Sequence, residues 1–95
     1  MPKYAMLSTL TPKGVRTLQA NPDRLKEVNR DVEELGATVV HQWSMVGAYD
    51  FLNIVEAPDA ATIAKVSMAL GARGSAHFQT FELIEIEDFL ELLPG

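Results

Sequence analysis

The stretch that most constrains the fold is a glycine-centred turn, Val46-Gly47-Ala48-Tyr49-Asp50-Phe51, with a strand-like run on each side. The run before it, residues 37–46, and the run after it, residues 51–56, are rich in β-branched and aromatic side chains, which favour strands. Glycine adopts the positive φ of a tight hairpin turn without steric cost. We therefore expect a β-hairpin over residues 37–56.

Two registers are open for this hairpin, and they differ in which side chains share a face. A two-residue loop of Gly47 and Ala48 places one set on a single face: His41, Trp43, Met45, Asp50, Leu52 and Ile54. A one-residue bulge would reverse the match, because strand side chains alternate between faces. Each face mixes large apolar groups with polar ones, so the sequence leaves open which face meets the helices.

Two helices are expected to flank the hairpin. The first spans residues 22–35, with Asn21 as N-cap, Pro22 at the first helical position and Gly36 just past the end. Its apolar positions recur at helical spacing and comprise Leu25, Val28, Val32 and Leu35. The second spans residues 59–70, with Asp59 as N-cap.

The rest of the chain supplies outer strands and short helical segments. Strands are expected over residues 4–10 and 76–84, and Thr11-Pro12 is expected to break the first strand before a short helical turn over residues 14–20. The tail, residues 85–93, has Ile86, Phe89, Leu90 and Leu93 on one helical face and is expected to form a short amphipathic helix.

This order is β-α-β-β-α-β with a C-terminal helix, which predicts a ferredoxin-like α+β fold with an antiparallel sheet. Right-handed crossovers place the first and third strands in the centre and both helices on one face. The opposite face then lacks cover, and we expect Phe51, Val55 or Trp43 to lie on it. The sequence therefore predicts a homodimer, or a higher homo-oligomer.

The length and the net charge of the chain limit which functions are expected. The 95 residues make one domain, residues 1–95, and the net charge of -5 is the wrong sign for following a phosphate backbone, so nucleic acid is not an expected partner. There is no cysteine, no signal-like N-terminus and no apolar run of the roughly 20 residues that span a bilayer. We expect a cytoplasmic protein with no membrane partner.

Tyr49 and Asp50 are the first candidates for a role beyond packing. Asp50 and the Tyr49 hydroxyl would hydrogen-bond a ligand at the sheet mouth, or Asp50 would only accept from backbone N–H groups of the Gly47 turn. Of the two, we favour the turn-tying role for Asp50, with Tyr49 contributing to a pocket or to the dimer face.

His41 and Trp43 are the second candidates, because residues two apart on a strand share a face. Imidazole and indole would bind a flat or carbonyl-bearing molecule there, with Asn53 as a further ligand-binding candidate. The alternative is that Trp43 is core and His41 a satisfied polar neighbour. His41, His77, Asp50 and Glu56 have metal-ligand chemistry, but their spacing matches no motif, so neither a metal nor a cofactor is expected.

The Gly47-Ala48-Tyr49-Asp50 signature is accompanied by further stretches spread along nearly the whole chain: Leu10–Gly14, Asn21–Arg24, Ile54–Asp59 and Met68–Gly74. With these stretches the chain resembles the GYD-domain family, small bacterial proteins with a Gly-x-Tyr-Asp-like signature. It implies a dimeric α+β barrel, in which two ferredoxin-like sheets pack face to face. It implies no established activity.

Three functions are therefore compatible with the sequence. The first is a homo-oligomeric small-molecule binding or sensing module, with a pocket between the sheets or under the terminal helix. The second is a cofactor-free enzyme, monooxygenase-like or isomerase-like, in which His41, Tyr49 or Asp50 acts as acid or base. The third is a structural assembly unit.

Overall fold

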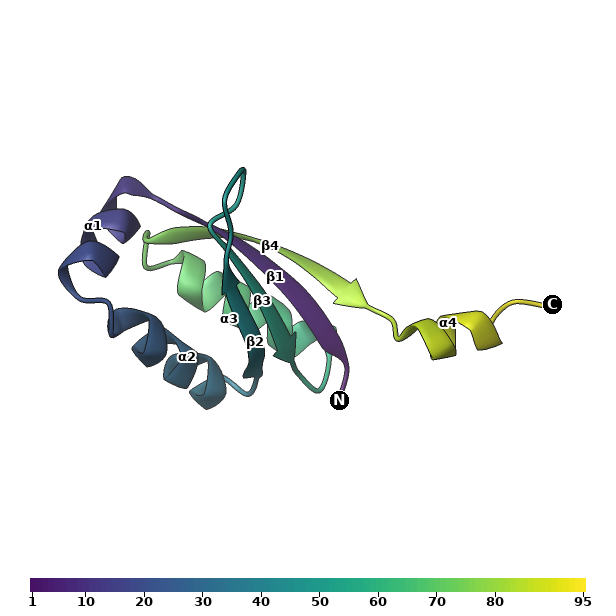
Figure 1. Cartoon of the computed structure of the whole chain (residues 1–95). Coiled ribbons are helices and arrows are strands. Elements are labelled where there is room, and N and C mark those ends of the chain that lie inside the picture. Colours follow the sequence, from purple (N-terminus) through teal and green to yellow (C-terminus); the bar gives the residue numbers. More distant parts are fainter.

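The computed structural model covers residues 1–95 and has the predicted α+β architecture (Figure 1). The strands are β1 (Lys3–Leu10), β2 (Thr38–Ser44), β3 (Phe51–Glu56) and β4 (Ala76–Leu83). The helices are α1 (Pro12–Ala20), α2 (Arg24–Glu34), α3 (Ala60–Gly71) and α4 (Ile86–Glu91). None of them is long and apolar enough to cross a membrane.

The sheet has the order β2-β3-β1-β4, and every neighbouring pair of strands is antiparallel. The first and third strands are central, as the crossover rule predicted. β1 pairs with β3 along one edge and with β4 along the other, so it has a partner on both sides over most of its length. The ferredoxin-like prediction is confirmed.

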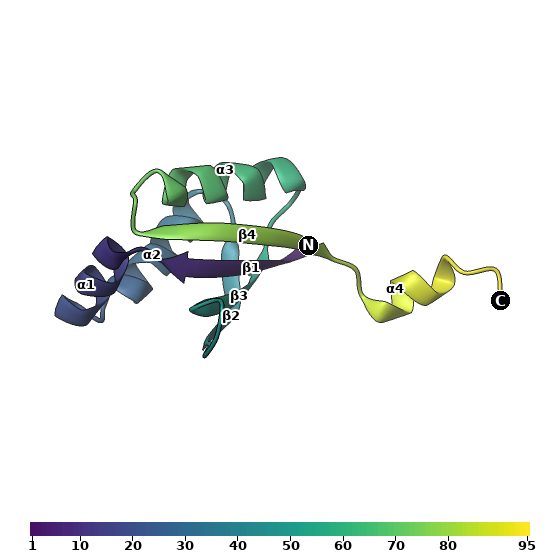
Figure 2. The same ribbon diagram turned by 90° about the horizontal axis from the view of Figure 1, so that it is seen from above.

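The hydrophobic core lies between the sheet and the helices of one face. Figure 2 shows α3 over this face, with the turn between β2 and β3 pointing to the other side. The core residues are Tyr4, Met6, Val32, Ala37, Val55, Ala57, Ile63, Val66 and Leu70. Val66 is fully buried, as its place in the α3 apolar stripe predicts.

The hairpin has the register of the two-residue loop. Trp43 lies opposite Leu52, and the backbone N–H of Met45 still donates to the carbonyl of Asp50 at 2.8 Å. The turn glycine, Gly47, has a φ of 140°. A bulge does occur, but between Val39 and His41 rather than at the turn.

This register decides which face meets the helices. Asn53 is buried on the helix side, and alternation puts Phe51 and Val55 there too. The expectation that Phe51 and Val55 lie on the uncovered face is wrong, because they stand opposite Ser8 and Tyr4, whose side chains point to the helices. Trp43 does lie on the uncovered face, 50% exposed.

The region after β1 also differs from expectation. β1 ends at Leu10, so the predicted break at Thr11 is confirmed, but the helix after it is longer than the predicted residues 14–20. The Thr11 side chain accepts from the Gly14 amide at 3.2 Å and caps α1, with Pro12 in the first turn. Gly14 is needed there because a Cβ would overlap the Ser75 carbonyl. The break signals are thus the start of a full helix.

Asn21 ends α1 rather than starting α2. Its backbone N–H donates to the Thr17 carbonyl at 3.0 Å. α2 begins after Asp23, which makes no side-chain cap bond. The same residue types favour an N-cap and the residue after a helix, so the sequence pattern did not separate the two.

The C-terminal arm, residues 84–95, leaves the body of the molecule beyond β4. Figures 1 and 2 both show α4 projecting away from the sheet and the other helices. Every residue of the arm is exposed, and Lys3 is tied to Glu85 by an ion pair of 3.2 Å. The arm gives the molecule its elongated dimensions of 53 × 29 × 19 Å.

Candidate functional site

The sheet face without helices, called the open face below, carries two rows of side chains that cross all four strands. One row consists of His41, Ile54, Ala5 and Phe81. The next consists of Trp43, Leu52, Leu7 and Gln79. Neither row contains a charged carboxylate, lysine or arginine, so the centre of the open face is apolar with amphipathic rings and an amide at its edges.

His41 and Trp43 stack at one edge of this face. Their ring centroids are 5.4 Å apart with an interplanar angle of 20°. Both residues are exposed, so neither is core. The predicted shared face is present, and binding of a flat ligand by this pair stays a prediction.

Tyr49 reaches across the open face from the hairpin. Its hydroxyl donates to Gln79 Oε1 on β4 at 2.8 Å, at an exposed position. This bond joins the hairpin to the far edge strand of the sheet. Tyr49 therefore belongs to the open face, together with Trp43 and His41.

The side chain of Asp50 does not accept from the backbone of the Gly47 turn. Its Oδ2 accepts from the backbone N–H of Leu10 at 2.7 Å, and its own N–H donates to the Ser8 carbonyl at 2.8 Å. The β1–β3 ladder ends at the pair of Ser8 and Phe51, so these two bonds extend it by one step. The expected turn-tying role is replaced by a long-range bond to β1.

Asn53 is separated from the other candidates, because it lies on the helix side. It accepts from Gln42 Nε2 at 2.7 Å and donates to the Met6 carbonyl at 2.9 Å. Asn29 on α2 completes the chain of amides through two bonds with Gln42, at 3.0 and 3.3 Å. Asn29 was missed, although it lies four residues after Leu25 and three before Val32, at a core-facing position of the helix.

A cavity of about 120 Å³ lies between the sheet and helices α1 and α2. It has 21 lining residues, of which 12 are hydrophobic, including Leu25, Val28 and Phe78. Arg24 and Arg73 are its charged lining residues. None of the sequence signals pointed to this cavity, because its walls come from segments far apart in the chain.

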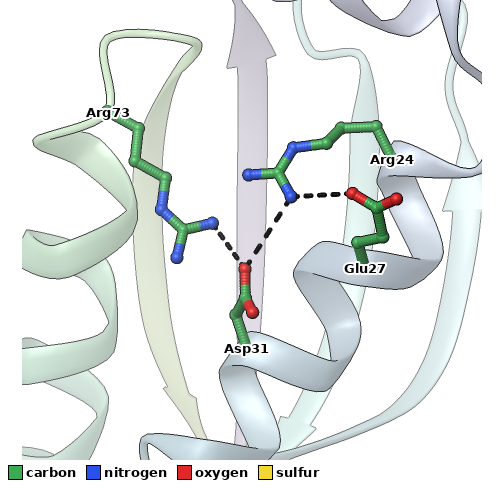
Figure 3. A network of polar contacts seen from close by, with 4 residues as sticks. All are labelled: Arg24, Glu27, Asp31 and Arg73. Carbon is green, nitrogen blue, oxygen red and sulfur yellow. Dashed lines mark hydrogen bonds and ion pairs between the residues drawn. The ribbon is translucent and has the colours of Figure 1, made fainter.

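The two arginines meet around one aspartate (Figure 3). Arg73 Nη1 donates to Asp31 Oδ2 at 2.8 Å, and Arg24 Nη1 lies 4.0 Å from the same oxygen. Arg24 Nη1 also donates to Glu27 at 3.0 Å. This network joins α2 to the segment after α3.

Two ionisable groups on the helix side have displaced pKa values. Hydrogen bonds from the Thr62 hydroxyl and backbone N–H lower the pKa of Asp59, the N-cap of α3. Burial raises the pKa of Tyr4, and the negative charges of Glu82 and Asp59 raise it further. Both displacements follow from structural positions on β1 and α3.

No group of three or more histidine, aspartate or glutamate side chains is arranged to hold a metal ion. His41 and His77 lie on the opposite edge strands β2 and β4.

These features define a small ferredoxin-like α+β protein with an apolar open face and a cavity under its helices. The family model of the GYD domain matches residues 4–93, and the chain belongs to the GYD-domain family. The resemblance seen in the sequence is confirmed.

A relative and a solved structure add to this. The chain is 47% identical over 94 residues, covering 98% of this chain and 99% of the relative, to a Thermus thermophilus protein named glutamine synthetase and cystathionine beta-lyase binding protein. It also resembles the crystal structure of TTHA0845 from Thermus thermophilus, with a TM-score of 0.57, 18% identity, and coverage of 90% of this chain and 95% of that one. The second match supports the fold alone.

Proposed function

We propose that this protein is a homodimeric protein-binding module, in which the open faces of two copies pack together and the dimer binds metabolic enzymes. The observation that carries the proposal is the open face itself. Trp43 and Phe81 are 50% and 51% exposed there, and Leu7, Leu52 and Ile54 lie between them. Contiguous apolar patches of a few hundred Å² on small proteins commonly mark interaction sites.

A second copy fits this face for two reasons. The two central rows carry no carboxylate, lysine or arginine, so two copies meet without burying like charges. The two rows run across all four strands, so two copies related by a two-fold axis present the same continuous apolar surface to each other. A specific dimer should bury more than about 1,000 Å² in total.

Protein binding is supported by the relative's name, since the two chains are 47% identical over almost their full lengths. Glutamine synthetase and cystathionine β-lyase are therefore the proposed partners. The C-terminal arm stays available to them when the open face is covered, because it projects beyond the sheet (Figures 1 and 2). The arm presents Ile86, Phe89, Leu90 and Leu93, all exposed.

Surface plasmon resonance with the immobilised full chain and the two purified enzymes tests the partner assignment. We expect at least one enzyme to bind, and Leu90→Asp on the arm to weaken binding. Val15→Asp, at an exposed apolar position of α1, serves as the matched control and should bind normally. Absence of binding by both enzymes would contradict the assignment.

The cavity under α1 and α2 favours a second candidate function, small-molecule binding. It is on the helix side, away from the open face, so both functions are compatible with one dimer.

A further inference from the structure

We propose that the cavity under α1 and α2 binds a small monocarboxylic acid with an apolar body, with the carboxylate between Arg24 and Arg73. This names a ligand class for the second candidate function and does not depend on the dimer. Three observations support it: the charge of the cavity wall, the free donors at its mouth, and a buried hydroxyl that faces it.

The charged residues that line the cavity are both arginines. Arg24 and Arg73 line it, whereas their partners Glu27 and Asp31 do not. A ligand inside therefore meets the guanidinium groups and lies farther from the two carboxylates. Because the four charges together sum to zero, a single negative charge suits the site better than the double charge of a phosphate ester.

The guanidinium groups retain unused donors. Each arginine bonds within the chain through Nη1 alone, which leaves Nε and Nη2 for a ligand. Figure 3 shows the two groups facing each other, with Asp31 on one side of the gap between them. A planar carboxylate is the group that a guanidinium binds best, through two parallel hydrogen bonds.

Ser8 points to the same space. It is only 4% exposed, lines the cavity, and its hydroxyl has no hydrogen-bond partner in the chain. Every side-chain polar atom that is inaccessible to solvent has a hydrogen-bond partner. Because the Ser8 hydroxyl has none, its oxygen is accessible, and the cavity is the space that it lines. Buried hydroxyl groups are normally hydrogen-bonded, so this oxygen marks a position for a polar atom of a ligand or for water.

The cavity also limits the size of the ligand and favours an apolar one. Leu25, Val28 and Phe78 form apolar walls. Its volume of about 120 Å³ is several times the roughly 10 to 15 Å³ that a cavity needs to hold one water, so a small organic molecule fits. Octanoate, with about ten non-hydrogen atoms, is a suitable probe.

The test is an NMR titration of the full chain with octanoate, with octan-1-ol and inorganic phosphate as comparison probes. We expect a Kd at or below about 1 mM for octanoate, with the largest shifts at the amides of Ser8 and Asn53. Octan-1-ol should bind more weakly at the same amides, and phosphate should shift none of them. The Trp43 indole N–H reports on the open face and should not move.

Four variants sharpen the test. Arg73→Met should weaken octanoate binding about tenfold or more, because a charged hydrogen bond is lost. Arg16→Met removes an exposed cation of α1 that does not line the cavity, and should change the affinity by no more than about twofold. Asp31→Asn removes the competing carboxylate and should tighten binding about threefold or more. Ser8→Val should weaken it.

The results that would contradict the proposal distinguish the carboxylate site from small-molecule binding in general. Equal affinity for octan-1-ol and octanoate, or wild-type affinity in Arg73→Met together with no tightening in Asp31→Asn, would overturn the carboxylate site and leave small-molecule binding standing. No shift at Ser8 or Asn53 with either octyl compound would overturn both. Shifts centred on Trp43 would assign the binding to the open face and also overturn the cavity site.

Discussion

The carboxylate of Asp50 and the backbone N–H of Leu10, forty residues apart in the chain, form a hydrogen bond of 2.7 Å. Asp50 stands at the base of the hairpin and Leu10 at the end of β1, where the ladder between β1 and β3 has already stopped. The bond therefore fixes the direction in which the hairpin leaves the sheet. Tyr49 is held by the same constraint as it reaches over to Gln79.

Loss of this bond should destabilise the protein. Asp50→Ala leaves the Leu10 donor without its partner and should lower the free energy of unfolding by about 1 to 3 kcal/mol, whereas Asp50→Asn keeps an acceptor and should cost about 1 kcal/mol or less. Urea unfolding measures both, and amide hydrogen exchange at Leu10 should accelerate in Asp50→Ala. Asp88→Ala on the exposed arm is the control. An Asp50→Ala protein as stable as the control would show that the bond carries no net energy.

The amide chain on the helix side should be more costly to break. Asn53→Leu removes the side-chain donor to the Met6 carbonyl and the shorter of the two bonds of Gln42 Nε2, which keeps only its 3.3 Å bond to Asn29. We therefore expect a loss of about 2 kcal/mol in the free energy of unfolding. Gln19→Leu, at an exposed position of α1, should be close to neutral. Denaturant unfolding of both variants gives the comparison. Similar stability of the two would mean that water replaces the lost partners.

The N-cap of α3 should make stability depend on acid pH. The pKa of Asp59 is lowered in the folded state by hydrogen bonds from Thr62, so its contribution is fully present above the unfolded pKa near 4 and is lost as the pH falls through the folded value. The stability difference between wild type and Asp59→Ser should therefore shrink between pH 5 and acid values below about 3, because serine caps the helix without a charge. A difference that does not vary with pH would exclude this linkage.

The C-terminal arm should be dispensable for stability, because its side chains are exposed. Phe89→Ser should change the free energy of unfolding by less than about 0.5 kcal/mol. Leu70→Ala, in the buried core, should cost about 2 to 5 kcal/mol in the same measurement. A loss in Phe89→Ser that grows with protein concentration would instead show that the arm packs on a second copy.

Sequence reasoning succeeded where neighbouring residues decide the structure. The Gly47 turn located the hairpin of β2 and β3 and limited it to two registers, one of which the structure shows, and the helical spacing from Leu25 to Leu35 identified α2. Right-handed crossovers then determined the strand order. These features depend on local conformational preference and on one rule of chain topology.

Sequence reasoning failed where contacts between distant segments determine the structure. The end of β1 at Leu10 was predicted, but α1 begins two residues earlier than expected, at Pro12, where Thr11 both caps the helix and donates to the Gly74 carbonyl. The partner of Asp50 is on another strand, and Arg73 meets Asp31 across 42 positions of the chain. The cavity is bounded by the same long-range contacts, so the local patterns around its residues did not reveal it.

Sedimentation equilibrium of the full chain is the most direct test of the claim that a second copy covers the open face. We predict a mass of twice 10.4 kDa at micromolar concentration, and a shift to 10.4 kDa for Leu52→Asp, which places like charges in the apolar centre of both faces. Val15→Asp on α1 should sediment as the wild type. A wild-type chain that stays at 10.4 kDa up to high micromolar concentration would contradict this claim.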